Sequence, residues 1–162
     1  AATAQQISAG RFWLGIGAGA SPQSRFGAEH AAVGVDLAAA VEVRHQRVVD
    51  FVSLAKEMWA DGVVGGIGAF PVPPSPIPVI VGVNSTALAR IAALHTDGIN
   101  VRWNHPRLEV IVAAARAARA DDAPPLLVTT WQPFEAALLD EDSIDRRRYA
   151  ALGVDRLIVV RR

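Results

Sequence analysis

Short apolar runs alternate with longer segments of helical periodicity along most of this chain, and this alternation constrains its fold more than any other feature. The apolar runs predict strands at Phe12–Ile16, Ile77–Val81, Gly98–Val101, Leu126–Thr130 and Arg156–Val160. The segments between them predict helices at Leu37–Trp59, Thr86–Leu94, Pro106–Ala120 and Ser143–Leu152. Strands that alternate with helices in this way are typical of an α/β fold with a parallel sheet.

The ends of the first long helix and its two flanking connections can also be placed. Asp36 is a preferred N-cap residue, and Gly62 is a typical helix stop. Residues 21–35 are rich in small residues and predict an irregular loop. Residues 60–78 are rich in glycine and proline, so they cannot form long regular elements.

The segment Gly10–Gly19 (GRFWLGIGAG) joins an apolar run to glycines at every second position, Gly15, Gly17 and Gly19. This pattern predicts a buried strand whose carboxyl end lets another molecule approach the backbone, because glycine has no Cβ. The other interpretation is a tight turn from the strand into the following loop.

Three segments together resemble the bacterial luciferase-like oxidoreductases, a family of FMN- and deazaflavin (F420)-dependent enzymes built on a TIM barrel. They are SAGRFWLGIGAG, PIPVIVGVNSTALARIAALHTDGI and GVDRLIVV, in the order that the family has them. The resemblance implies a single domain over residues 1–162 that is the C-terminal portion, about strands 4 to 8, of such a barrel.

Chain length and the first residues agree with a partial barrel. A complete (β/α)₈ barrel takes ~250 residues, whereas this chain has 162. Ala1–Ile7 has the composition of the end of a helix and no capping box ahead of it. We therefore expect the first three strands of the barrel to be missing here. In the family pattern, residues 60–78 lie over the barrel mouth, as either a shortened substrate lid or a rigid connector.

The resemblance implies an oxidoreductase or monooxygenase that moves hydride between a flavin or deazaflavin and a small organic substrate. Some FMN-using relatives carry an arginine where this chain has Ala18, which favours F420 over FMN as the cofactor. The family's ring-facing residues lie largely on the missing strands, so no catalytic residue is assigned. The alternative is a catalytically silent fragment or interaction module that needs a partner chain to complete the barrel.

Asn84-Ser85-Thr86 follows a predicted strand and opens a predicted helix. A helix N-terminus exposes unpaired N–H groups and partial positive charge, and hydroxyl groups add donors, so this turn can hold a phosphate. Asparagine, serine and threonine are also the preferred N-cap residues, which is the purely structural interpretation. In the family this turn binds the cofactor phosphate.

The next strand ends at Asn100-Val101, where relatives also contact the cofactor phosphate, largely through the backbone. Arg102 and Trp103 follow at the same rim, where they either bind a phosphate or stack on a ligand, or serve in surface and packing roles. The resemblance thus implies a cofactor site comprising Ala18, Gly19, Val83, Asn84, Ser85, Thr86, Asn100 and Val101.

Composition excludes several other classes of protein and site. The 16 basic and 16 acidic residues balance, so a nucleic-acid partner is not expected. The absence of cysteine excludes disulfides and thiolate chemistry, and agrees with a cytoplasmic protein. No apolar run is long enough for a membrane span. The four histidines lack metal-ligand spacing, so no metal site is expected. The predicted partners are a small-molecule substrate and either further copies of this chain in a homo-oligomer or another chain segment that completes the barrel.

Overall fold

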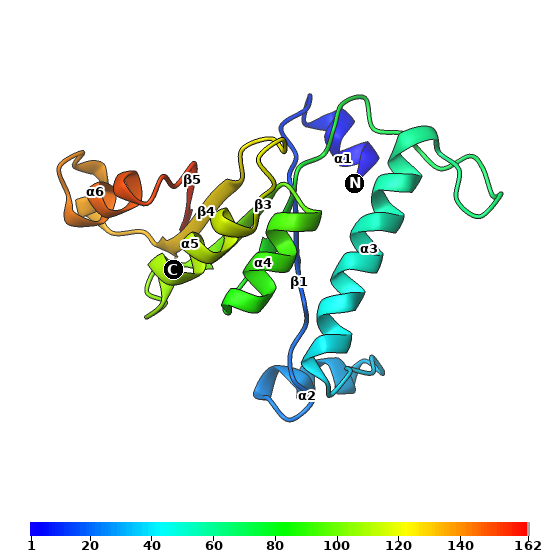
Figure 1. Cartoon of the computed structure of the whole chain (residues 1–162), viewed down its shortest axis with the longest axis horizontal. Coiled ribbons are helices and arrows are strands. Elements are labelled where there is room, and N and C mark those ends of the chain that lie inside the picture. The colour runs from blue at the N-terminus through cyan, green and yellow to red at the C-terminus, as the bar shows by residue number, and fades with distance from the viewer. Residues whose placement is uncertain (162) are drawn as a thin grey trace. The chain divides into compact units, whose positions relative to one another are not determined.

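A computed structural model describes residues 1–161, in which five strands alternate with helices (Figure 1). The chain divides into two compact units, Ala1–Ile77 and Pro78–Arg162. The predicted α/β class with alternating strands and helices is confirmed.

The first unit contains three helices and one strand: α1 (Ala2–Ile7), β1 (Leu14–Gly17), α2 (Arg25–Ala32) and α3 (Val41–Asp61). Gln5 of α1 is fully buried and ties this helix to a distant segment of the unit. Its Nε2 donates to Ser75 Oγ (3.0 Å) and to the carbonyl oxygen of Pro76 (2.8 Å), while its Oε1 accepts from the Phe12 N–H (3.1 Å). The side chain therefore satisfies three polar groups at once.

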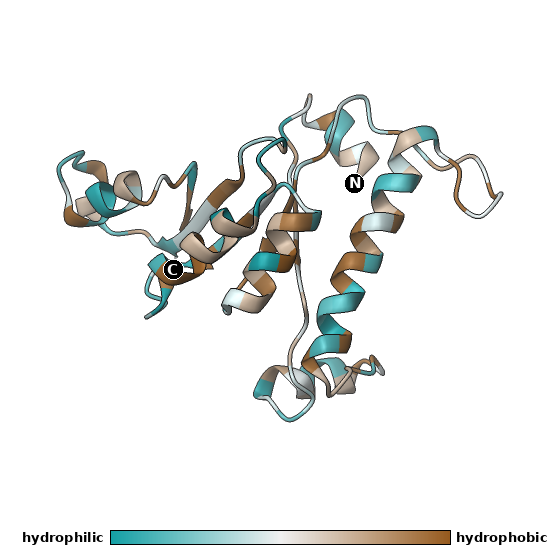
Figure 2. Ribbon diagram, in the orientation of Figure 1, coloured by the Kyte–Doolittle hydropathy of each residue, from teal (hydrophilic) through white to brown (hydrophobic). Residues whose placement is uncertain are grey.

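Helix α3 is amphipathic, and Figure 2 shows hydrophobic and hydrophilic residues interspersed along it. Its buried residues are Val48, Val52 and Ala55, which recur at helical spacing. The helix ends at Gly62 as predicted, where φ is +76° and the left-handed conformation favours glycine.

Three predictions for this unit are wrong in detail. β1 is four residues long, and its residues are half-buried or exposed rather than buried. The predicted loop contains α2, whose N-cap Ser24 accepts a hydrogen bond from the Gly27 N–H (3.1 Å). The N-cap of α3 is Ala40, without a side-chain bond, rather than Asp36.

The second unit is a parallel sheet with helices between its strands. In chain order its elements are β2 (Val79–Gly82), α4 (Thr86–His95), β3 (Gly98–Arg102), α5 (Leu108–Ala118), β4 (Leu127–Pro133), the 3-10 helix η1 (Ala136–Leu139), α6 (Ile144–Ala151) and β5 (Arg156–Val160). The strands β2 to β5 lie side by side in sequence order. The residues with no exposed surface include Val79, Val81, Ile99, Val101 and Ile111, so the core lies on the sheet face that α4 and α5 cover.

An aspartate immediately before β3 and another before β5 fix the register of the sheet. Asp97 Oδ2 accepts from the Val79 N–H (2.8 Å), and its own N–H donates to the Val79 carbonyl (3.0 Å). Asp155 makes the same pair of bonds to Val128, at 2.7 and 2.8 Å. Each aspartate thus joins its strand to the start of the preceding one.

Two arginines near the end of α5 hold the C-termini of the neighbouring helices. Arg116 Nη2 donates to the carbonyl oxygens of Leu152 (2.7 Å) and Gly153 (3.1 Å), at the end of α6. Arg119 donates in the same way to the carbonyl oxygens of Ala93 and Thr96, at the end of α4. Cations are favourable there because a helix C-terminus carries partial negative charge.

Tyr149 of α6 is buried, and its hydroxyl donates to Oε1 of the buried Gln132. Burial, with a smaller contribution from the Asp145 carboxylate, raises the pKa of Tyr149 to about 12. The neutral phenol is therefore favoured in the folded state.

We expect this tyrosine to make stability fall at alkaline pH. The contribution of Tyr149 to the free energy of unfolding is complete below the ordinary pKa of 10.0 and is lost as the pH rises through about 12. Because the chain has a single tyrosine, tyrosinate absorbance reports this group alone. Titration of the folded protein at the ordinary pKa would contradict the expectation, and Tyr149→Phe should remove this part of the pH dependence of unfolding.

Candidate functional site

The carboxyl ends of β2 and β3 form one rim of the second unit, and the predicted phosphate turn lies there. Gly82 of β2 is in register with Asn100 of β3. The next residue, Val83, is buried, and its N–H donates to the Asn100 carbonyl (2.9 Å). Val83 therefore contributes packing and backbone structure to the rim.

Ser85 is the N-cap of α4, so the structural role weighed for this turn is confirmed. Its Oγ accepts from the Leu88 N–H (3.3 Å). The Ser85 hydroxyl hydrogen can still be donated, because accepting a bond does not consume it. Asn84 is exposed and Thr86 half-buried, and the first-turn N–H groups of a helix have no intrahelical acceptor. The turn thus retains donors that an anionic group can use.

Asn100 and Val101 have different surroundings although they are adjacent. Asn100 Nδ2 donates to Thr129 Oγ1 (2.6 Å), so the amide side chain is held against β4. Val101 has no exposed surface, and its carbonyl accepts from Thr130 Oγ1 (2.7 Å). The Val101 side chain is therefore a core residue, whereas the half-buried Asn100 lies on the opposite face of the sheet.

Arg102 pairs with an aromatic residue that the sequence analysis did not single out. Register places Arg102 opposite Trp131 of β4, and its guanidinium carbon lies 5.6 Å from the centre of the Trp131 ring. This distance is within the range of a cation–π contact. The Trp103 N–H donates to the Trp131 carbonyl (3.3 Å). Trp131, rather than Trp103, is thus the aromatic partner of Arg102 at this rim.

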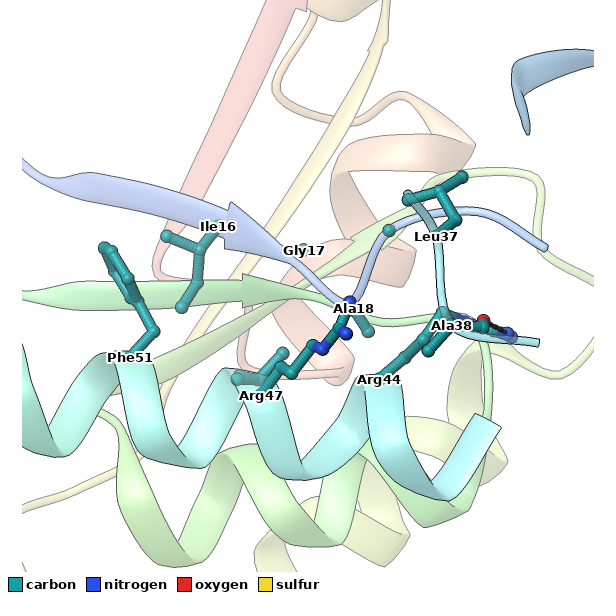
Figure 3. A pocket seen from close by; sticks show the side chains of 10 residues that line it. Ile16, Gly17, Ala18, Leu37, Ala38, Arg44, Arg47 and Phe51 are labelled. Carbon is teal, nitrogen blue, oxygen red and sulfur yellow. Dashed lines mark hydrogen bonds between the residues drawn. The ribbon is translucent and has the colours of Figure 1, made fainter. Parts of the chain in front are cut away.

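In the first unit, Ala18 and Gly19 line a cavity of about 440 Å³ at the carboxyl end of β1 (Figure 3). Its walls come from the end of β1, the segment before α3, and the first half of α3. The lining residues are Ile16, Gly17, Ala18, Gly19, Leu37, Ala38, Arg44, Arg47, Val48 and Phe51. Figure 3 shows Arg44, Arg47 and Phe51 on successive turns of α3, on the side of the helix that faces Ile16 and Ala18.

The glycines at the carboxyl end of β1 differ in whether the backbone or the packing requires glycine at their positions. Gly19 has φ of +72°, a conformation that a residue with a Cβ rarely adopts. A Cβ built at Gly15 or Gly17 would meet no atom within 4 Å. Packing among the described residues therefore does not require glycine at those two positions, and the backbone there is open to approach.

Within residues 1–161, no group of three or more His, Cys, Asp or Glu side chains is placed to hold a metal ion. The four histidines lie on or beside different elements: α2, α3, the end of α4 and the start of α5. No helix in this part of the chain is long and apolar enough to cross a membrane.

Comparisons with known proteins identify the family and the fold. Residues 1–154 match the family described as luciferase-like monooxygenase. A solved F420-dependent secondary alcohol dehydrogenase, in complex with an F420–acetone adduct, is similar with a TM-score of 0.69 and 13% identity. The match covers 99% of this chain and 67% of the dehydrogenase chain. The crystal structure of apo-MsnO8 is similar with a TM-score of 0.61 and 18% identity, over 98% of this chain and 49% of its own.

These likenesses confirm the predicted fold class, parallel strands alternating with helices as in part of a luciferase-like TIM barrel. The chain spans about two thirds of the length of the first structure and half that of the second. No match was found among curated proteins.

Proposed function

This chain belongs to the luciferase-like monooxygenase family, and we propose that it acts as an oxidoreductase with a flavin-type cofactor. The proposed cofactor is F420, with FMN as the alternative, and the proposed reaction moves hydride between the cofactor and a small organic substrate. The family match over residues 1–154 is the observation that carries this proposal. The F420-dependent alcohol dehydrogenase among the similar structures supports F420.

The cofactor phosphate would lie at the start of α4. Asn84, Ser85 and Thr86 present side-chain donors and the first-turn N–H groups at the carboxyl edge of the sheet. This arrangement fits a phosphate without requiring a basic side chain. Val83, Asn100 and Val101 would support it through the backbone, and Asn100 also through its amide.

Bound there, the cofactor would supply the hydride chemistry, while residues of this chain bind and orient it. The Arg102–Trp131 pair lies two residues beyond Asn100 and Thr129, on the same face of the sheet. It would provide a cationic and planar surface at the rim. Ala18 and Gly19, in the first unit, remain proposed cofactor contacts on the strength of the family resemblance.

Replacing Ser85 and Thr86 together by alanine should weaken binding of F420 or FMN about tenfold or more. The substitution removes two hydroxyl donors, and one hydrogen bond to a charged group contributes ~1.5–3 kcal/mol. Binding is measured by titrating each cofactor and following its ring absorbance. An unchanged affinity in a protein that binds the cofactor would remove the phosphate assignment.

Ser143→Ala is the matched control. Ser143 caps α6 as Ser85 caps α4, accepting from the Arg146 N–H (3.4 Å). Loss of either N-cap is expected to cost ~1 kcal/mol of stability. Only the change at the α4 turn should alter cofactor affinity.

A second candidate function is an interaction module that pairs with a partner, either a second copy or another chain segment. Among the described strands of the second unit, β5 pairs with β4 alone. Its residues Ile158, Val159 and Val160 are 45%, 45% and 43% exposed. An open strand edge with apolar side chains is suited to pairing with another strand. Failure of the protein to bind either F420 or FMN would favour this function over the enzyme.

A further inference from the structure

A second cavity lies at the edge of the sheet opposite the proposed phosphate turn. Its volume is about 440 Å³, and it lies within the second unit, where α5 ends and where β4 and β5 begin. The turn at the start of α4, by contrast, follows the carboxyl end of β2. The charged residues that line the cavity are Arg116, Arg119, Asp121 and Asp155.

The two arginines are held in place by backbone carbonyl groups and still have N–H donors to offer. Arg116 uses Nη2 for two carbonyl oxygens at the end of α6. Arg119 uses Nη1 and Nε for three, at the end of α4 and in the segment before β4. An arginine carries N–H groups on all three of its nitrogens, so Nη1 and Nε of Arg116 and Nη2 of Arg119 remain for a ligand. Among residues 1–161, neither guanidinium forms a salt bridge.

Two carboxylates line the same cavity without pairing with these arginines. Asp155 Oδ2 accepts from the Val128 N–H (2.7 Å), which fixes this carboxylate at the start of β5. Asp121 is exposed, and its side chain forms no hydrogen bond or ion pair with residues 1–161. The cavity therefore presents positive and negative groups that the fold does not pair with one another.

The rest of the lining is apolar or lacks a side chain. Ala120, Pro125 and Leu126 supply its apolar side chains. At Gly153, a Cβ would lie 2.6 Å from Arg116 Nη2, so glycine lets the guanidinium lie against this turn. The cavity thus combines both signs of charge with an apolar surface.

We propose that this cavity binds a small zwitterion, an aliphatic amino acid. Its carboxylate would pair with the two arginines, its ammonium group with Asp121 and Asp155, and its side chain would contact the apolar lining. Guanidinium groups match a carboxylate, and an ammonium group has three donors for carboxylate oxygens. An ion of a single sign would be attracted by two of the four charges and repelled by the other two. Because the cavity lies at the edge away from the cofactor turn, this assignment does not rest on the proposed function.

Free leucine and two singly charged analogues test the assignment on the wild-type protein. Isocaproate is leucine without its ammonium group, and isoamylamine is leucine without its carboxylate, so all three share one apolar chain. Leucine should bind about tenfold more tightly than either analogue, because each analogue lacks the charge-assisted bonds of one group. Binding is measured by NMR titration, following the backbone amide signals of Asp121, Gly153 and Asp155, which line the cavity.

Asp121→Asn removes one charge of the cavity and no bond within the described chain. It should weaken leucine binding about threefold, the effect of losing one exposed ion pair, and should not weaken isocaproate binding. Asp122→Asn is the matched control, because Asp122 is the adjacent residue, is also exposed and does not line the cavity. The control should alter the binding of neither ligand.

Arg116→Gln tests the positive side of the cavity. It should weaken the binding of leucine and of isocaproate about tenfold and should not weaken that of isoamylamine. Arg90→Gln, an exposed site on α4 with the same charge change, is the control and should alter none of the three. Because Arg116 also holds the end of α6, urea unfolding checks that the variant is folded. If it is not, the leucine comparison and Asp121→Asn still decide the assignment.

Several results would overturn the assignment. They are absence of leucine binding, equal binding of leucine and its analogues, and equal effects of Asp121→Asn and Asp122→Asn. Displacement of leucine by saturating FMN or F420 would also overturn it, because leucine would then occupy the cofactor edge. If the protein binds neither FMN nor F420 but binds leucine with the expected preference, the proposed function fails and the zwitterion site is supported.

Discussion

Gly98→Ala is expected to destabilise the second unit by more than about 3 kcal/mol, because the site cannot relax without moving the backbone. Gly98 is the first residue of β3, between β2 and β4. A Cβ at this position would lie 2.4 Å from the Leu127 carbonyl oxygen, 2.7 Å from the Leu127 Cβ and 2.8 Å from the Ile80 Cδ1. The Leu127 carbonyl oxygen is a backbone atom, and no rotamer change moves the Leu127 Cβ, so the overlap can be relieved only by moving the backbone.

The change in unfolding free energy is measured by urea denaturation of the variant and of the wild type. Gly17→Ala is the control, since an alanine there meets open space. It should leave stability within about 1 kcal/mol of wild type, because Gly→Ala at an unstrained site alters mainly the unfolded chain. Similar midpoints for the two variants would show that β3 can shift to admit the methyl group.

Much of the second unit follows from local sequence patterns. The predicted bounds of the last strand are those of β5, and the helix before it ends at Ala151, one residue before the predicted end and two before Gly153, where φ is +58°. The strand predicted to begin at Gly98 also has the start that β3 has, directly after Asp97. These positions depend on local chemistry, namely an apolar run, a left-handed glycine, or a carboxylate that binds the neighbouring backbone.

Elements that lack such a signal were missed. Helix α2 is only eight residues long and contains Gly27, and glycine is a poor helix former, so the composition around its N-cap Ser24 predicts a loop instead. The 3-10 helix η1 is only four residues long, so it has no periodicity to detect. The half-burial of β1 could not be predicted because an apolar run indicates a strand but not what covers it.

At the candidate sites too, features that depend on local residue type could be predicted, and features that depend on the folded arrangement could not. The capping role of Ser85 was one of two interpretations that its residue type allowed, and the structure confirms it. Trp131 was missed because its contact with Arg102 depends on strand register across 29 positions. In the sequence, Arg44 and Arg47 are charged residues between the apolar positions of a long predicted helix, and nothing distinguishes them from its other charged residues. Only folding places them beside Ala18. Cations near Ala18 weaken the argument that alanine at this position favours F420 over FMN.

Arg119→Ala is expected to cost about 3 kcal/mol, the second largest effect predicted, because it leaves several carbonyl groups without a donor. Arg119 Nη1 donates to the carbonyl oxygens of Ala93 (2.6 Å) and Thr96 (2.7 Å), and Nε donates to that of Pro124 (2.9 Å). The half-buried side chain thereby joins the end of α4 to the segment that leads into β4. These are charge-assisted bonds at a helix C-terminus, where a cation is also favoured by the helix dipole.

Arg119→Lys and Arg90→Ala separate the geometry of these bonds from the charge alone. Lysine keeps the positive charge but replaces the planar fork with one ammonium group, so Arg119→Lys should lose part of the stability that Arg119→Ala loses. Arg90 is exposed on the same helix that Arg119 holds, and its removal should cost less than about 0.5 kcal/mol. Thermal and urea unfolding of the three variants would show this order. If Arg119→Ala unfolds at the midpoint of Arg90→Ala, the carbonyl groups at the end of α4 are satisfied by water once the guanidinium is gone, and Arg119 does not hold the helix end.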